Sequence, residues 1–272
     1  RDTLLGVLLP AVEDFLERQH GSSWHLLFPD SNLSAHLGRQ TSATLLHREG
    51  VQYHWFNQDY RHFDDFLSRL SSRRRKTLRK ERQAAAEGLS FRWLEGEQIT
   101  AKALLDFYPF YASTYLRRGQ RPYLGPTFFT ALASTMADQM LLLKIEKETA
   151  TVASALFFRD ATTLYGRYWG CGEDRPFLHF EACYYQGIEY CIRQGLQRFD
   201  AGAQGEHKLL RGFEPVVTES WHWIRHSGFR HAIARFLEEE RSDVAGYREA
   251  ARDYLPFRQT NESTRLPPDI EG

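Results

Sequence analysis

Residues 140–170 read MLLLKIEKETATVASALFFRDATTLYGRYWG and contain three apolar runs that short polar turns separate. Apolar runs of this length are typical of strands, and turns this short join antiparallel neighbours. A helical pattern over 178–194 and a further apolar run over 197–201 follow directly. The order of three strands, a helix and a strand predicts an α/β fold whose last strand comes after a crossover helix.

Helical and strand-like patterns also alternate on both sides of this stretch. The periodicity predicts helices over 4–19, 63–86, 101–116, 127–137 and 232–254, and strands near 25–28, 44–47, 52–56, 89–94 and 220–225. We therefore expect four parts, which are a partial α/β unit over 1–58, a basic connecting helix over 59–88, a second α/β domain over 89–257 and a flexible polar tail over 258–272. Because the chain opens at Arg1 without an initiator Met, we expect an N-terminal stretch to precede it.

Composition limits the class of protein. The 272 residues carry 35 basic and 35 acidic side chains, so a nucleic acid or a membrane surface could be met only through a local patch. No apolar run approaches the roughly 20 residues that span a bilayer, and we expect no membrane segment. The three cysteines, Cys171, Cys183 and Cys191, form an odd set that is typical of reduced thiols, which indicates a cytoplasmic protein.

The candidate active site lies where the strand after the crossover helix diverges from its neighbour. Strand ends at such a point form a cleft. The two segments that meet there, 167–181 and 202–211, are rich in Gly, His, Glu, Arg and Lys. These residue types allow close backbone approach and handle protons or negative charge.

The first segment holds an Arg-x-x-Gly-x-Gly pattern formed by Arg167, Gly170 and Gly172. The pattern resembles the pyrophosphate loop of coenzyme A dependent acetyltransferases, in which exposed N–H groups at a helix start bind phosphate. The alternative is a strand followed by a glycine turn. We assign donor binding to this pattern together with the aromatic residues Tyr165 and Trp169 that flank Arg167.

His179 and Glu181 fall in the first turn of the following helix. Glu181 could act as a base or orient a substrate amine, and His179 could bind substrate. The structural alternative is a charge interaction of Glu181 with the helix start and a hydrogen-bonded surface position for His179. His179 and Cys183 stand four residues apart, but no further ligands fall in register, so we expect no metal site.

The second segment, FDAGAQGEHKLLRGF over 199–213, gathers polar side chains after a strand. Lys208 and Arg211 could bind a phosphate or stabilise the oxyanion that forms when an amine attacks an ester or thioester. His207 or Glu206 could accept the proton of the amine. Gln204 is a candidate substrate contact. The alternative is a solvated loop with an ion pair between Glu206 and Arg211.

A basic stretch precedes the second domain. Arg73, Arg74, Arg75, Lys76 and Arg79 are its candidate RNA contacts. Such cations can follow a phosphate backbone, and binding of this kind is sensitive to salt. The alternative is that the stretch forms only a solvated helix face.

Three strings point to one family. LYGRYWGC over 164–171, LHFEACYYQGIEYCI over 178–192 and GAQGEHKLLRGF over 202–213 resemble those of the FemAB-like proteins of peptidoglycan biosynthesis or recognition. The resemblance extends over about 22–257. It implies a tandem fold of the GNAT type, the acyl-CoA N-acyltransferase fold, whose first half is incomplete in this chain.

The resemblance also implies a reaction. Fem transferases move an amino acid from aminoacyl-tRNA onto the peptide of a cell-wall precursor, and a lysine in a Phe-Lys-x-x-Phe-Gly loop contacts the donor or the reacting centre. Lys208 is the matching position, although His207 replaces the first Phe and Arg211-Gly212 are inserted before Phe213.

Three hypotheses remain open from the sequence. The first is an aminoacyl transferase acting on an amine of a cell-wall precursor peptide, with tRNA as a partner. The second is an acyl-CoA dependent N-acyltransferase that uses the Arg167 pattern. The third is a non-catalytic module that binds cell-wall peptide or RNA through the same cleft.

Overall fold

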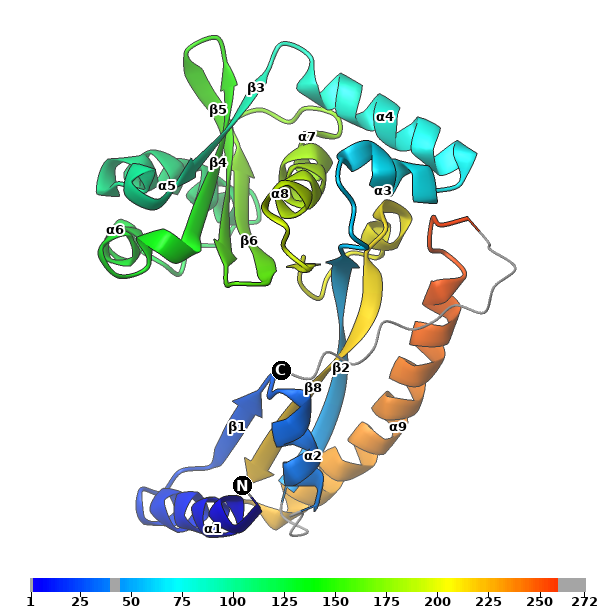
Figure 1. Ribbon diagram of the computed structural model, residues 1–272. Helices are drawn as coiled ribbons and strands as arrows, with labels where there is room; N and C mark the ends of the chain where they lie inside the picture. The colour runs from blue at the N-terminus through cyan, green and yellow to red at the C-terminus, as the bar shows by residue number, and fades with distance from the viewer. Residues whose placement is uncertain (1, 40–44, 259–272) are drawn as a thin grey trace. The chain divides into compact units, whose positions relative to one another are not determined.

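The computed structural model describes residues 2–39 and 45–258, which fall into two compact units (Figure 1). One unit contains the chain up to residue 52 together with 215–253, and the other contains 53–214 and 254–258. Strands β2 (Leu45–Phe56) and β8 (Glu214–Ile224) each have residues in both units. The tail expected over 258–272 lies outside the described residues apart from Arg258.

The second unit is built on the quoted stretch. Its sheet is ordered β7-β6-β5-β4-β3, with the end of β2 beside β7. The strands are β3 (Ser90–Glu95), β4 (Met140–Lys147), β5 (Ala150–Arg159), β6 (Thr163–Cys171) and β7 (Arg198–Asp200). Every pair is antiparallel except β6 with β7, which is parallel. The predicted α/β fold with a crossover before the last strand is confirmed.

Helices cover both faces of this sheet (Figure 1). On one side are α5 (Ala101–Leu116) and α6 (Pro126–Thr135), and on the other are α7 (Leu178–Phe180), η3 (Glu181–Tyr185) and α8 (Gln186–Gln194), with α3 (Phe63–Arg69) and α4 (Ser72–Ala86) beside them. The side chains of Leu104, Phe107 and Leu156 are buried between α5 and the sheet. Burial of this apolar surface is the main force that fixes the helices to the strands.

The helix expected over 178–194 is interrupted by one π-helical turn, η3. A π turn inserts a residue into an α-helix and is frequent at functional sites. Within it Glu181, Tyr184 and Tyr185 are all buried, so the turn directs three polar side chains into the unit. Periodicity alone predicts a regular helix here and cannot show the insertion.

The parallel strands diverge as the sequence predicts. Pairing of β6 with β7 ends at Tyr165 and Asp200. Beyond this point β6 continues to Cys171, whereas the segment that follows β7 turns away at Gly202, which has a φ of 80°. The divergence places the ends of the two candidate segments next to each other.

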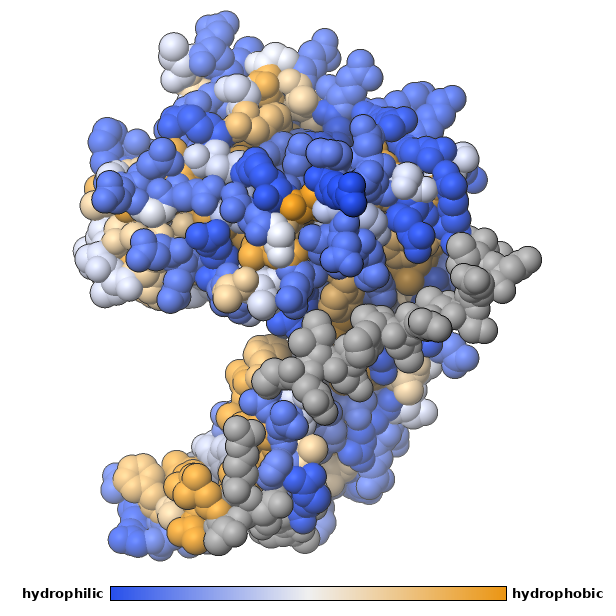
Figure 2. Space-filling model, viewed as in Figure 1, coloured by the Kyte–Doolittle hydropathy of each residue, from blue (hydrophilic) through white to orange (hydrophobic). Residues whose placement is uncertain are grey.

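The first unit has its own core. It contains α1 (Asp2–Arg18), β1 (Ser23–Leu27), α2 (Ser31–Arg39) and α9 (Ser227–Arg252), with parts of β2 and β8. Trp221 and Trp223 of β8 pack with Leu37 of α2, and Trp221 Nε1 donates to Ser34 Oγ at 2.9 Å. Helix α1 leaves Leu4, Val7 and Phe15 largely exposed, within the apolar patch at the lower left of Figure 2.

Two expectations about these elements are wrong, and one helix was not expected. The helix expected over 63–86 breaks into α3 and α4 at Leu70, which adopts extended backbone and forms a bridge with Phe257. The strands expected around a turn at Gly50 form the single strand β2, and α2 was not predicted.

None of the helices in the described ranges combines the length and hydropathy that a membrane span needs.

Candidate functional site

Lys208 lies at the point where β6 and β7 diverge. It belongs to η4 (Glu206–Arg211), and its side chain is only 3% exposed. Its Nζ donates to the backbone oxygens of Ala201 at 2.5 Å and Gly202 at 3.2 Å, the first residues beyond β7. Burial lowers the pKa of the ammonium to about 8, an effect that the negative charge of Asp200 opposes. A cation is therefore held in a buried position where the two strands diverge.

Two aromatic rings line the same cation. The Lys208 Nζ is 5.5 Å from the ring centroid of Tyr53 and 5.9 Å from that of Tyr184. Ring faces attract a cation at such distances. An ammonium carries three N–H bonds, and the two backbone oxygens take two of them. The third can donate to a bound substrate.

A chain of three polar side chains leads away from this lysine. Tyr184 Oη lies 3.0 Å from Nε2 of His207 and 3.4 Å from Nε2 of His179. We call His207, Tyr184 and His179 the relay. The π turn places the middle member, Tyr184, between the two imidazoles. Periodicity predicts a regular helix here, so the position of Tyr184 could not be predicted from the sequence.

Both imidazoles of the relay have a lowered pKa. Although His179 is exposed at the surface, the protein atoms packed around its ring lower its pKa to about 4 by desolvation, with further contributions from the charges of His207, Lys208 and Arg211. The pKa of His207 is also lowered, first by burial and then by Arg211 and Lys208. A neutral imidazole can accept a proton near pH 7.

Gly205 makes room for His207, because a Cβ there would lie 2.5 Å from the ring atom Cε1.

Glu181 is occupied by a structural ion pair. Its carboxylate is 2% exposed and accepts from Nε and Nη2 of Arg82 at 3.0 and 2.9 Å. Gln186 Nε2 donates to the same group at 2.8 Å. These contacts indicate a structural role for Glu181. Its partner is Arg82 of the basic helix α4, whereas the structural alternative from the sequence was the start of its own helix.

Arg211 supports the loop that carries His207. Its Nη1 donates to the backbone oxygen of His207 at 2.9 Å, and its Nη2 contacts both carboxylate oxygens of Glu81 at 3.1 and 3.0 Å. The guanidinium carbon also lies 3.5 Å from the ring centroid of Phe180. The partner of Arg211 is therefore Glu81, and the alternative pair with Glu206 is not formed. Glu206 and Gln204 are exposed on the same loop.

The two glycines of the Arg-x-x-Gly-x-Gly pattern are both engaged within the unit, Gly170 by packing and Gly172 by a backbone hydrogen bond. A Cβ at Gly170 would lie 1.8 Å from the backbone oxygen of Phe110 in α5, so only glycine allows this approach. The Gly172 N–H donates to the backbone oxygen of Val152 at 2.8 Å. That amide is committed to the sheet, which matches the alternative of a strand and a glycine turn.

The other members of the first segment point in different directions. Arg167 is exposed, donates to Tyr123 Oη at 3.3 Å and covers the ring of Tyr168. Tyr165 Oη donates to Asp160 at 2.6 Å, in the hairpin before β6. Trp169 lies next to the relay, with its ring centroid 5.6 Å from that of His179.

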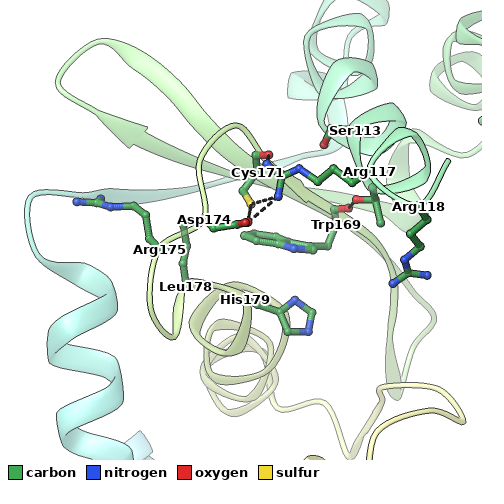
Figure 3. Close-up of a pocket in the computed structure, with 10 residues that line it drawn as sticks. Ser113, Arg117, Arg118, Trp169, Cys171, Asp174, Arg175, Leu178 and His179 are labelled. Carbon is green, nitrogen blue, oxygen red and sulfur yellow. Dashed lines mark hydrogen bonds and ion pairs between the residues drawn. The ribbon is translucent and has the colours of Figure 1, made fainter.

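Trp169 and His179 also line a pocket of about 290 Å³ at the end of β6. Its remaining lining residues are Ser113, Thr114, Arg117, Arg118, Cys171, Asp174, Arg175 and Leu178 (Figure 3). Sequence patterns do not reveal that the end of α5 contributes to this pocket, because Arg117 and Arg118 stand about 45 residues before β6 in the chain.

The candidate RNA contacts are spread over helix α4. Arg73, Lys76 and Arg79 are exposed, and Arg74 and Arg75 are partly buried. Arg79 forms an exposed ion pair with Asp64 at 2.8 Å. The outer side of α4 is thus basic, while Glu81 and Arg82 face the unit interior.

The fold and the site together define the class of protein. A mixed sheet whose parallel pair diverges beside a buried lysine, with helices on both faces, is a GNAT-like fold. The chain matches the FemAB-like family, described as peptidoglycan biosynthesis/recognition, over residues 1–259. It therefore belongs to this family, as the three strings indicated. No curated protein matches the chain significantly in sequence.

Solved structures of low identity share this fold. FemX matches with a TM-score of 0.58 at 12% identity, over 86% of this chain and 80% of that one. L-PGS from Bacillus licheniformis matches with 0.56 at 12%, over 83% and 77%. The C-terminal domain of a putative lysylphosphatidylglycerol synthetase from Agrobacterium fabrum matches with 0.51 at 15%, over 84% and 76%. At these identities the similarities show the fold alone.

Proposed function

We propose that this chain is a transferase that moves an acyl or aminoacyl group onto an amine of a cell-wall precursor peptide. The observation that carries the proposal is the buried Lys208 ammonium at the diverging strand ends, with one N–H bond left for a substrate oxygen. Membership of the FemAB-like family supports a cell-wall acceptor.

The donor that we propose is aminoacyl-tRNA. The exposed cations of α4 provide a local patch for a phosphate backbone on a chain with no net charge. The alternative donor, an acyl-coenzyme A, would bind at the Arg-x-x-Gly-x-Gly pattern. This alternative has less support, because the Gly172 amide is bonded within the sheet and Gly170 packs against α5.

In the proposed reaction, Lys208 and His207 act on the two reacting groups. The acceptor nitrogen attacks the carbonyl carbon of the donor ester, a C–N bond forms, and the carbonyl oxygen becomes negative. Lys208 donates its remaining N–H to this oxyanion. His207 takes the proton of the amine and returns it to the leaving oxygen when the C–O bond breaks. Tyr184 holds the His207 ring through its hydroxyl.

Transfer of a radiolabelled amino acid from charged tRNA to a precursor peptide tests the proposal. We expect the wild type to turn over and Lys208→Met to lose at least about a hundredfold in kcat, the usual effect of removing an oxyanion donor. Lys102→Met is the matched control, because Lys102 is an exposed lysine whose ion pair, with Asp106, lies on the surface of α5. Binding of the peptide without turnover by the wild type would instead identify a recognition module.

A further inference from the structure

Asp200 is the last residue of β7 and directly precedes the two residues whose backbone oxygens bind the Lys208 ammonium. Its Oδ1 accepts the N–H of Gly202 at 2.7 Å, and an aspartate that accepts from the backbone two residues ahead stabilises a turn. Gly202 has a φ of 80°, which glycine adopts without the steric cost of a side chain. The carboxylate therefore holds the turn that presents the oxygens of Ala201 and Gly202 to Lys208.

Strand β2 fixes the same turn from the other side. The N–H of Tyr53 donates to the Gly202 oxygen and the N–H of Ala201 donates to the Tyr53 oxygen, both at 3.1 Å. His54 is the partner of Asp200 in the register of the two strands, and its Nε2 lies 3.5 Å from Asp200 Oδ1. The side chains of His54 and Asp200 are only 7% and 18% exposed, so water competes little for these contacts.

Asp200 also brings negative charge to this region. Burial alone would raise the pKa of its carboxyl, but the contacts with His54 and the Gly202 N–H lower the pKa overall, so the group is ionised near pH 7. Its charge favours the protonated form of Lys208 and opposes the effect of burial on that amine. The same carboxylate thus acts on Lys208 through the turn and through its charge.

The other groups close to the ammonium do not replace this charge. Among the described residues, those whose charge or ring acts on Lys208 or on the relay are Tyr53 of β2, His179 of α7, Cys183 and Tyr184 of η3, and His207 and Arg211 of η4. None of these is a carboxylate. Burial raises the pKa of the Cys183 thiol and of the Tyr184 hydroxyl, so both are neutral near pH 7.

We propose that Asp200 is the positioning residue of Lys208, because its carboxylate holds the turn that binds the ammonium and places a negative charge near it. Asp200 acts on the reacting groups only through Lys208. Its effect on transfer rests on the proposed function, whereas its effect on the charge of Lys208 can be measured without any substrate.

Two substitutions separate the turn from the charge. Asp200→Asn keeps an oxygen that can accept the Gly202 N–H and removes the negative charge. Asp200→Glu keeps the charge and displaces the oxygen by one methylene. Asp160→Asn is the matched control, because Oδ1 of Asp160 also accepts the N–H two residues ahead, from Thr162 at 2.8 Å, in the hairpin before β6.

The pKa of Lys208 is the first readout. NMR titration of the full chain, isotopically labelled at lysine Cε, follows this pKa, and the signal that disappears in Lys208→Met assigns the resonance. The wild-type value is about 8, and we expect Asp200→Asn to lower it by about one unit. Asp200→Glu and Asp160→Asn should both keep the wild-type value.

Transfer of the amino acid gives the second readout. For Asp200→Asn we expect the upper pH limit of kcat to move down with the pKa of Lys208, and kcat at lower pH to equal that of the wild type. For Asp200→Glu we expect the limit to stay and kcat to fall at every pH by at least about tenfold, with little change in KM, because the ammonium loses its fixed position.

The two readouts distinguish failure of this proposal from failure of the proposed function. A lowered pKa of Lys208 in Asp200→Asn supports the role of the charge even if the wild type transfers nothing, in which case only the proposed function is rejected. An unchanged pKa in Asp200→Asn, or an equal decrease in Asp160→Asn, overturns the role of the charge. If Asp200→Glu keeps the wild-type kcat at every pH, the carboxylate does not hold the turn and that role is rejected.

Discussion

The guanidinium of Arg82 holds the carboxylate of Glu181 through two nitrogens, at 3.0 and 2.9 Å, with Glu181 only 2% exposed. The pair joins helix α4 to the π turn that carries Tyr184. Removing one partner of a buried pair leaves the other charge uncompensated, which typically destabilises a protein by about 3–5 kcal/mol. We expect Arg82→Ala to lower the free energy of unfolding by an amount of this order, measured by urea denaturation.

Arg79→Ala is the control for this prediction. Arg79 lies one turn away on the same helix, and its ion pair with Asp64 is exposed at both ends. Exposed pairs contribute roughly 0–1 kcal/mol. Equal losses from the two variants would show that Glu181 does not depend on Arg82, and would return Glu181 to the candidate bases.

The two glycines of the Arg-x-x-Gly-x-Gly pattern should respond differently to a methyl group. At Gly170 the added Cβ would lie 1.8 Å from the Phe110 oxygen, whereas at Gly172 the nearest atom, the Val152 oxygen, is 3.5 Å away. Overpacking of this kind usually destabilises by roughly 1–3 kcal/mol or more. We expect a lower melting temperature for Gly170→Ala and little change for Gly172→Ala. Unchanged stability of Gly170→Ala would contradict the packing role.

The fold could be predicted from the sequence in part, and the role of Gly170 shows where such a prediction ends. The order of strands and helix, and the divergence beside Lys208, follow from apolar periodicity and were predicted correctly. The role of Gly170 did not follow, because its constraint is the backbone of Phe110, sixty residues away in the chain. The partners of Arg211 and Glu181 were missed for the same reason, since Glu81 and Arg82 lie on a helix whose basic sequence indicates either an RNA contact or a solvated face, and neither predicts a contact with the interior.

The depressed pKa of Lys208 predicts an upper pH limit for transfer. Its pKa in the folded chain is about 8, below its ordinary value of 10.5, because burial disfavours the charged form. Stabilisation of an oxyanion requires the protonated amine, which is lost as the pH rises through about 8. We expect kcat to fall above this pH, and we expect Lys208→Arg to retain its remaining activity at higher pH because a guanidinium stays charged.

The pH dependence of stability tests the lowered pKa of Lys208 independently. Between pH 8 and 10.5 the unfolded chain binds a proton at Lys208 that the folded chain has released. The free energy of unfolding should therefore rise with pH across this interval in the wild type relative to Lys208→Met. A constant difference between the two proteins would mean that Lys208 titrates normally.

The basic face of α4 predicts salt-dependent binding of RNA. Arg73 and Lys76 are exposed, and each phosphate that such a cation neutralises releases counterions. The logarithm of the affinity for charged tRNA should fall linearly with the logarithm of the salt concentration. The double variant Arg73→Gln/Lys76→Gln should reduce this slope by about one for each cation removed. Filter binding at several salt concentrations measures both.

Lys102→Gln/Lys147→Gln is the matched control for the RNA prediction. It removes the same number of exposed charges from the same unit but away from α4. If both double variants change the slope equally, the effect is one of total charge and α4 is a solvated helix face.

We expect removal of the Tyr184 hydroxyl to lower the rate of transfer strongly and the stability of the fold only slightly. Its hydroxyl is 3.0 Å from His207 Nε2 and 3.4 Å from His179 Nε2, whereas its ring packs against Phe213. Tyr184→Phe keeps the ring and removes the hydroxyl, so we expect a loss of roughly 1 kcal/mol in stability. A positioned proton acceptor contributes about 10²- to 10⁴-fold to a rate, so a misplaced His207 should lower kcat by up to about a hundredfold with little change in KM. Tyr190→Phe is the control, because its hydroxyl bonds Glu95 outside the relay. If Tyr184→Phe keeps the wild-type kcat, His207 acts without the relay and the π turn serves only to pack the sheet.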